Sequence, residues 1–236
     1  MEHLKGISMT TNINAYSAAN AVTAMQNRST NTYGIKDTAD NIEVNWNAIF
    51  GAGSPYSSVT VSDTNAPISI SGTQYNAALK NNPSVMASNL KTMTSNTASA
   101  NYAGLTVTGI SDAKTLAAAI GDSHVTQIKV QMSVADIKRS LTTLTASSKI
   151  AASGITATPT SPATTPQLDL SYAQFKALGG TDNGVIASTS ALSKFSGFNF
   201  AITDASVAQA GSLTIGGVSK ISSVAIKDSG ANIQTA

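Results

Sequence analysis

The stretch Tyr33-Gly-Ile-Lys-Asp-Thr-Ala-Asp-Asn-Ile42 occurs three times, in related form, along this chain of 236 residues. The second form is Ile128-Lys-Val-Gln-Met-Ser-Val-Ala-Asp-Ile137, and the third is Val224-Ala-Ile-Lys-Asp-Ser-Gly-Ala-Asn-Ile233. The final isoleucines are 95 and 96 positions apart. A regular spacing of this kind indicates a chain built from tandem structural repeats.

The sequence between these stretches also matches in order. Ser71-Gly-Thr-Gln-Tyr75 corresponds to Ser171-Tyr-Ala-Gln-Phe175, and Ile110-Ser-Asp-Ala113 corresponds to Ile202-Thr-Asp-Ala205. We therefore predict four segments: an N-terminal lead (1–32), a first repeat (33–127), a second repeat (128–223) and the truncated start of a third (224–236).

Each of the three stretches predicts a strand followed by a capped helix. Apolar residues alternate with small or polar ones at the start of each stretch, which is the period of a half-buried strand. A hydroxyl residue then stands at the expected helix N-cap, namely Thr38, Ser133 and Ser229. Apolar residues follow at helical spacing, with Ile42, Trp46 and Ile49 in the first repeat and Ile137, Leu141 and Leu144 in the second.

The remaining elements are also short. Ser71 with Gln74 and Ser171 with Gln174 fit the Ser-x-x-Gln capping box of a further helix. Ala-rich helices are predicted over 112–120 and 204–210, and the segments 81–101 and 156–166 read as surface loops. Further strands are predicted at 58–62, 67–71, 105–107, 155–158, 167–170 and 198–200. The predicted fold class is α+β, β-rich with short capped helices.

The composition excludes several classes of function. The 14 Lys and Arg are balanced by 12 Asp and Glu, so the chain has no basic surface for nucleic acid. With 29 Thr and 32 Ser, about one residue in four carries a hydroxyl, whereas charged residues make up only 11%. The absence of cysteine excludes disulfides and thiolate chemistry. No apolar run approaches the roughly 20 residues that span a bilayer, and no secretory signal peptide is visible.

The Asp37-Thr-Ala-Asp-Asn-Ile42 stretch, repeated at about 95 residues in a chain poor in charge, resembles the Asp-Thr-Ala-x-Asn-Ile repeats of large secreted bacterial surface proteins. These are adhesin-like, S-layer-like and matrix proteins, often exported by type I machinery. The resemblance implies an extracellular or cell-surface location, reached without a visible signal peptide. The calcium-binding nonapeptide of related secreted proteins is absent, so the resemblance implies no calcium site.

The sequence offers little for catalysis. His124 lacks a Gly-x-Ser-x-Gly nucleophile elbow anywhere in the chain, and no Asp-x-Asp-x-Asp-Gly calcium loop occurs. Trp46 and Tyr75 stand on predicted apolar helix faces, which favours core packing over sugar binding. We therefore expect no catalytic residue, metal or cofactor.

The C-terminal segment 221–236 carries the functional prediction. A strand without a partner recruits another strand. The segment either packs back onto the second repeat or continues the repeat in a neighbouring molecule, and we expect the second outcome. Head-to-tail strand addition would give a homo-oligomeric filament or S-layer-like lattice, as in a biofilm matrix. The predicted assembly interface consists of Ile221, Val224, Ile226, Ile233, Val22 and Met25. The alternative is a monomeric adhesive module with an unknown surface ligand, and an enzyme is the third reading.

Overall fold

The structure is a computed structural model, and it describes residues 17, 33–50, 56–62, 67–81, 94–95, 104–216 and 219–234. The chain divides into two compact units. The first comprises Met1–Ile68 and Ala77–Ala103, and the second comprises Ser69–Asn76 and Gly104–Ala236. The segment boundaries that the sequence repeat indicates stay predictions.

The first unit contains a sheet with strand order β1-β2-β4. Its elements are β1 (Tyr33–Asp37), α2 (Ala39–Val44), α3 (Trp46–Ile49), β2 (Tyr56–Val61) and β4 (Thr94–Ser95). Both pairings are parallel, and Ile35 lies opposite Val59. Trp46 is fully buried and stacks on Phe50 at a ring-centroid distance of 4.1 Å. The predicted core position of Trp46 is confirmed.

The second unit begins with a sheet of strand order β3-β5-β6-β7. β5 and β6, and then β6 and β7, pair in parallel. The elements are β3 (Ile68–Ser71), α4 (Gly72–Asn81), β5 (Leu105–Ile110), α6 (Ala113–Gly121), β6 (Val125–Met132), α7 (Val134–Arg139), α8 (Leu141–Ala146) and β7 (Ile155–Ala157). The boundary between the units cuts through β3 and α4. Ser69–Asn76 belongs to the second unit, whereas Ile68 and the part of α4 from Ala77 onward belong to the first.

A second sheet of this unit has the order β8-β9-β10, again parallel. Its elements are β8 (Gln167–Leu170), α9 (Tyr172–Ala177), the 3₁₀ helix η1 (Ala191–Lys194), β9 (Asn199–Ala205), α10 (Val207–Ser212), β10 (Ile221–Ile226) and α11 (Gly230–Gln234). Phe195 adds a parallel bridge to Ile155 of β7, which links this part of the chain to the preceding sheet.

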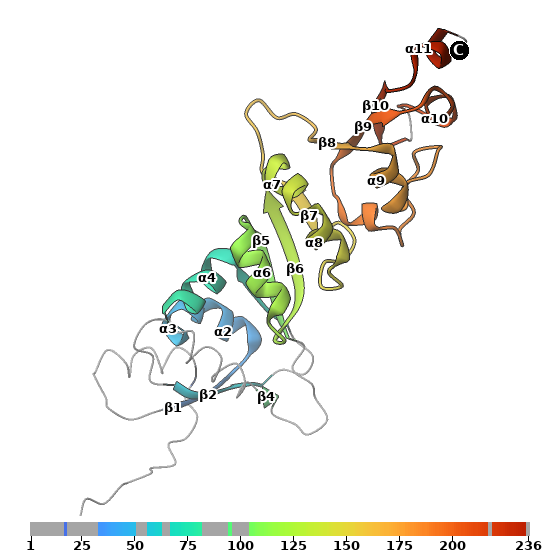
Figure 1. The fold of residues 1–236 in the computed structure, drawn as a ribbon. Helices are drawn as coiled ribbons and strands as arrows, with labels where there is room; N and C mark the ends of the chain where they lie inside the picture. Colours follow the sequence, from blue (N-terminus) through green and yellow to red (C-terminus); the bar gives the residue numbers. More distant parts are fainter. Residues whose placement is uncertain are drawn as a thin grey trace, which may run out of the picture. The chain divides into compact units, whose positions relative to one another are not determined.

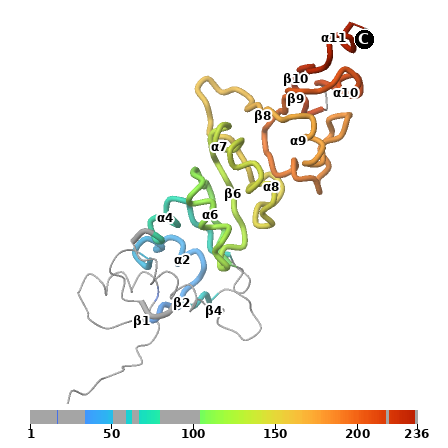
Figure 2. The backbone as a smooth tube through the Cα atoms, in the orientation of Figure 1, coloured from blue at the N-terminus to red at the C-terminus, as the bar shows by residue number. Residues whose placement is uncertain are grey.

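Three helices of the second unit each contact the strand that precedes them and the strand that follows them in the chain. α6 contacts β5 and β6, α9 contacts β8 and β9, and α10 contacts β9 and β10. Figure 1 shows these helices beside the strands that they connect, and the trace in Figure 2 passes through them in chain order. A parallel pair needs a crossover between its strands, and a helix supplies it here.

The predicted mixture of strands and short helices is confirmed, with one difference in class. The strand pairings described within the sheets are parallel, with helices as crossovers, so the arrangement is α/β rather than the predicted α+β. Alternating apolar residues indicate a strand but not the direction of its partner. Pairing direction depends on residues far away in the sequence.

The predicted helix starts agree closely with the structure. The Thr38 and Ser133 hydroxyls accept hydrogen bonds from the backbone N–H groups of Asn41 and Asp136. Ser171 and Gln174 form a reciprocal capping box. The predicted helix over 204–210 starts later, at Val207, because Ser206 and Gln209 form a second capping box there.

The predicted helical stripes are buried, but each is divided between two short helices. α2 gives way to α3 at Asn45, and α7 gives way to α8 at Ser140. The two residues have nearly the same backbone angles, φ −96° and ψ 10° for Asn45 and φ −98° and ψ 8° for Ser140. The Asn45 side chain donates to the Asn41 carbonyl at 2.8 Å, which competes with the regular helix ladder.

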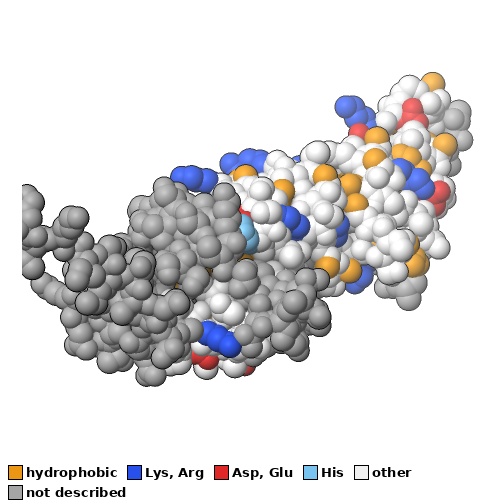
Figure 3. Space-filling view, turned by 90° about the horizontal axis from the view of Figure 1, so that it is seen from below, with side chains coloured by type: hydrophobic (Ala, Val, Ile, Leu, Met, Phe, Trp, Pro, Cys, Tyr) orange, Lys and Arg blue, Asp and Glu red, His pale blue; other side chains and the backbone are white. Residues whose placement is uncertain are grey.

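Hydroxyl side chains link neighbouring strands and explain part of the unusual composition. Five hydroxyls on described strands donate to a backbone carbonyl of the preceding strand in the same sheet, each worth about 0.5–1.5 kcal/mol net. The pairs are Thr108 to Ile70, Thr126 to Leu105, Thr156 to Val130, Thr203 to Leu170 and Ser222 to Phe200, at 3.0–3.4 Å. The described surface in Figure 3 is mostly neutral, with few charged side chains.

Candidate functional site

The predicted assembly segment is part of the second sheet. β10 pairs in parallel with β9 of its own chain, with Ile221 opposite Phe200 and Val224 opposite Ile202. The sequence predicts that this strand docks into a neighbouring molecule, but it packs back onto β9, a strand of the predicted second repeat, so the expectation is wrong for one edge of β10. β10 is the end strand of its sheet, and no described strand pairs with its other edge.

The apolar residues of β10 and α11 differ in exposure from those at matching positions of the first two stretches. In the strands, Ile35 is 1% exposed and Val130 is 2% exposed, whereas Ile226 is 51% exposed. In the helices that follow, Ile42 and Ile137 are each 0% exposed, whereas Ile233 is 51% exposed. Ile226 and Ile233 are thus half exposed where their counterparts are buried, and we call these two residues the β10 end surface.

The second stretch shows what covers such positions. β7 pairs with the edge of β6 and places Ile155 opposite Val130. α7, which carries Ile137, contacts β8. In the second stretch, therefore, the parallel strand β7 pairs with the outer edge of β6, and the strand β8 packs against the helix α7.

The side chain of Asp228 fixes the position of α11 although this helix buries none of its residues. Its Oδ1 accepts from Ser229 N–H at 2.7 Å and from Asn232 Nδ2 at 2.8 Å, and its Oδ2 accepts from Val207 N–H of α10 at 3.0 Å. The hydrogen bond from Asn232, followed by those from Val207 and Ser229, lowers the pKa of the Asp228 carboxyl. Polar contacts therefore hold the β10 end surface in place.

The structure separates the predicted interface residues into three groups. Ile226 and Ile233 are about half exposed, and Val224 is intermediate. Ile221 is 1% exposed, so its side chain belongs to the core of its own chain rather than to a free surface. Val22 and Met25 lie outside the described residues.

His124 belongs to a hydrogen-bonded cluster at the end of α6. Its Nδ1 lies 2.8 Å from Asp122 Oδ1, and the Tyr75 hydroxyl donates to Asp122 Oδ2 at 2.9 Å. Lys149 Nζ donates to the carbonyls of Ile120 and Asp122 at 2.7 and 2.6 Å. Burial, and then the charge and hydrogen bond of Asp122, raise the pKa of Tyr75. These contacts join the end of α6 to Tyr75 of α4 and to Lys149, which precedes β7.

Among the described residues, no three His, Cys, Asp or Glu side chains gather in a group able to hold a metal ion. No helix in the described ranges combines the length and the apolar character needed to cross a membrane.

Comparison with known proteins gives no assignment: no protein-family model matches the chain, and neither a curated protein nor a solved structure matches it significantly.

Proposed function

We propose that this chain is a structural, self-assembling protein of a bacterial surface or extracellular matrix, in which a neighbouring molecule covers the β10 end surface. The observation that carries the proposal is the 51% exposure of both Ile226 and Ile233, at positions that are buried in the two related stretches. Matching residues that differ only in their cover indicate a surface suited to the same kind of cover.

The order of elements supports a repeat of about 95 residues. A strand, two short helices and a strand (β1, α2, α3, β2) are followed by strand–helix pairs (β3 with α4, β5 with α6). A similar order recurs in β6, α7, α8 and β7, followed by β8 with α9 and β9 with α10, except that η1 stands between α9 and β9 where β4 stands between α4 and β5. β10 and α11 then correspond to β1 and α2. In this interpretation the neighbour adds a strand of the β2 and β7 type to β10.

The direction of assembly follows from the pairing of β10. Because β10 already holds β9 of its own chain, it remains within its own molecule and accepts a strand on its outer edge. The added strand runs parallel to β10 and donates a hydroxyl to a β10 carbonyl, as Thr156 of β7 donates to the Val130 carbonyl of β6. In a second copy β2 is paired on both edges, whereas β7 is the end strand of its sheet and, among the described residues, its outer edge holds only the single bridge from Ile155 to Phe195. β7 of a second copy is therefore the strand that can be added, so contact becomes head-to-tail and gives a filament or lattice.

Sedimentation velocity over a range of concentrations tests the proposal. The wild-type chain should form assemblies that grow with concentration, and these should be visible by negative-stain microscopy. The double variant Ile226→Asp, Ile233→Asp should stay monomeric. Burying the exposed half of two isoleucines is worth about 2–3 kcal/mol, so their loss alone weakens association about a hundredfold.

Ile215→Asp is the matched control, because Ile215 is 54% exposed in the same unit but lies outside β10 and α11. This variant should assemble like the wild type. Assembly by the double variant would exclude the β10 end surface as the interface. A wild-type chain that stays monomeric at every concentration would favour the adhesive alternative.

A further inference from the structure

The connection between β7 and β8 has a composition found nowhere else in the chain. It reads Thr158-Pro-Thr-Ser-Pro-Ala-Thr-Thr-Pro166, with five hydroxyl residues and three of the six prolines of the chain in nine residues. The side chains of residues 158–165 are all exposed. We call this segment the hydroxyl-proline loop.

The loop is attached at its two ends and free between them. Thr158 N–H donates to the Met132 carbonyl at 2.8 Å, and the Pro166 carbonyl accepts from Asn199 N–H at 3.0 Å. Residues 159–165 make no backbone–backbone hydrogen bond with the described chain. Proline keeps such a segment extended and unable to join a sheet, so an enzyme can bind it as an extended chain.

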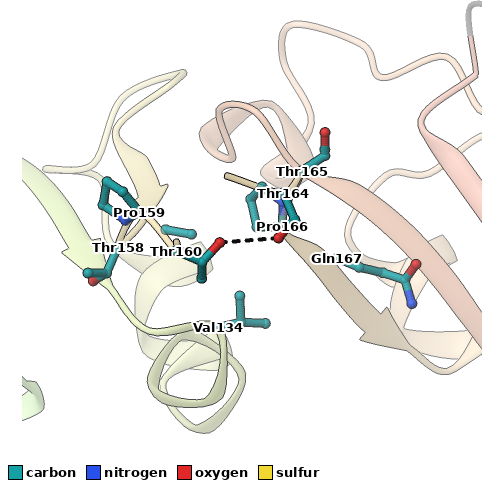
Figure 4. Close-up of a pocket in the computed structure, with 9 residues that line it drawn as sticks. Val134, Thr158, Pro159, Thr160, Thr164, Thr165, Pro166 and Gln167 are labelled. Carbon is teal, nitrogen blue, oxygen red and sulfur yellow. Dashed lines mark hydrogen bonds between the residues drawn. The ribbon is translucent and has the colours of Figure 1, made fainter. Parts of the chain in front are cut away.

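The hydroxyls of the loop fall into two sets. Thr160 and Thr164 face each other across a shallow hollow of about 350 Å³, with their oxygens 3.2 Å apart (Figure 4). The Thr160 hydroxyl also lies 3.2 Å from the Pro162 carbonyl. The hydroxyls of Thr158, Ser161 and Thr165 make no hydrogen bond with the described chain, and each of these residues stands directly before a proline.

The loop is longer than the connection at the matching place in the first repeat. The matching connection between β2 and β3 spans six residues, 62–67, whereas the hydroxyl-proline loop spans nine. A Ser/Thr-rich segment with prolines is typical of O-glycosylated chains. The neighbourhood also suits a neutral group: residues 150–168 contain no charged side chain, so an added phosphate would have no Lys or Arg within its own segment to pair with.

We propose that Thr158, Ser161 and Thr165 are acceptor sites for O-glycosylation. The donor is a sugar activated as a phosphate ester. The side-chain oxygen attacks the anomeric carbon and forms the glycosidic bond, the bond from that carbon to the donor phosphate breaks, and the hydroxyl proton passes to a base of the transferase. The glycans add hydrated bulk to an exposed loop that contains neither residue of the β10 end surface.

Mass spectrometry of the chain purified from the cells that naturally produce it tests this inference. Trypsin releases the whole loop in one peptide, Ile150–Lys176, because the next cleavable residues are Lys149 and Lys176. We expect this peptide to carry hexose or N-acetylhexosamine mass increments that alkaline β-elimination removes. An unmodified peptide, a phosphorylated peptide, or glycans confined to other peptides would overturn the proposal.

Two variants made in the same cells identify the acceptor residues. The triple variant Thr158→Val, Ser161→Ala, Thr165→Val should lose every glycan from this peptide. The matched double variant Thr160→Val, Thr164→Val keeps the proposed acceptors and should retain the glycans. Glycans that persist in the triple variant, or disappear only in the double variant, would overturn the assignment.

Discussion

Asp228 shows how a single polar side chain orients an element that has almost no core of its own. Its carboxylate joins α10 to α11 through Val207 and also caps α11 through Ser229 and Asn232. The same arrangement occurs at Asp37, whose Oδ1 accepts from Thr38 N–H and Asn41 Nδ2 at 2.8 and 2.7 Å. Contacts within the chain, both local and with α10, therefore hold α11 in position.

The variant Asp228→Ala should loosen α11 without unfolding the rest of the chain. Hydrogen exchange of the Asn232 and Ile233 amides should become faster, while exchange in β6 stays unchanged. Asp169→Ala is a suitable control, since Asp169 makes only an exposed ion pair with Lys138 and a long contact with Gln167. Equal exchange at Asn232 in the wild type and in Asp228→Ala would contradict the assigned role.

The same carboxylate predicts an acid response. The pKa of Asp228 is lower in the folded chain than the ordinary value of about 3.9. Its contribution is therefore fully present above about pH 4 and is lost as the pH falls through the lower folded-state value. The protection factors of the α11 amides, which are corrected for the intrinsic exchange rate at each pH, should fall below about pH 4 in the wild type, and Asp228→Ala should show a smaller change.

Tyr75 gives a residue-scale prediction for the core of the second unit. The variant Tyr75→Phe removes a hydrogen bond to the Asp122 carboxylate and should lower the free energy of unfolding by about 1.5–3 kcal/mol. Because burial raises the pKa of Tyr75, the wild type should lose stability as the pH rises above about 10, the ordinary tyrosine value. Urea unfolding at pH 7 and above pH 10 measures both effects, and an alkaline loss of equal size in the variant would contradict the second.

At the scale of elements, local signals in the sequence predicted more than long-range ones. The Ser71 and Ser171 capping boxes, the N-cap hydroxyls of Thr38 and Ser133 and the buried helical stripes depend on residues within one or two turns of each other. The start of α10 was missed although Ser206-x-x-Gln209 is the same capping pattern as the other two. That signal was present in the sequence.

The sequence pattern did not predict contacts between residues that are far apart in the sequence. Parallel pairing, the hydroxyl links from strand to strand and the cluster of Tyr75, Asp122 and Lys149 join residues that are 20 to 47 positions apart. The pairing of β10 with β9 belongs to the same group. For the candidate site, the sequence identified Ile226 and Ile233 but not the burial of Ile221, since exposure depends on which elements lie nearby.

The capping box of α10 gives a prediction for this element. Ser206→Ala should destabilise the chain by about 1 kcal/mol, because the backbone N–H of Gln209 loses its acceptor. Ser212→Ala, at the other end of the same helix, removes only an exposed hydroxyl bond to the Gln209 carbonyl and should have little effect. Chemical unfolding of both variants tests the difference, and equal losses would show that the cap is not responsible.

At the scale of the whole molecule, the feature that bears most on assembly is the edge of β10 with which no strand of the described ranges pairs. Proteins usually protect an edge strand with charge, proline or a covering element, because a free edge recruits other strands. β10 carries no charged residue or proline along Ile221–Ile226, and Ile226 at its end and Ile233 of α11 are each half exposed. This combination favours association over protection.

Strand addition predicts that an isolated strand of the β2 type blocks assembly. A peptide with the sequence of residues 56–62, Tyr-Ser-Ser-Val-Thr-Val-Ser, should occupy the β10 edge in parallel and reduce the size of the sedimenting species. The same peptide with Thr60→Pro should have no effect, since proline removes a backbone donor and distorts the strand. An unmodified peptide that leaves assembly unchanged at a large molar excess would argue against this geometry.

The most direct test of the account is the reactivity of a single thiol placed in the β10 end surface. The chain contains no cysteine, so Ile226→Cys introduces a unique probe, and Ile215→Cys provides a control of similar exposure. We predict that a thiol at position 226 reacts rapidly in dilute solution and becomes protected as the concentration rises and the chain assembles, while one at 215 stays reactive throughout. A thiol at 226 that reacts equally fast in monomer and assembly would contradict the account.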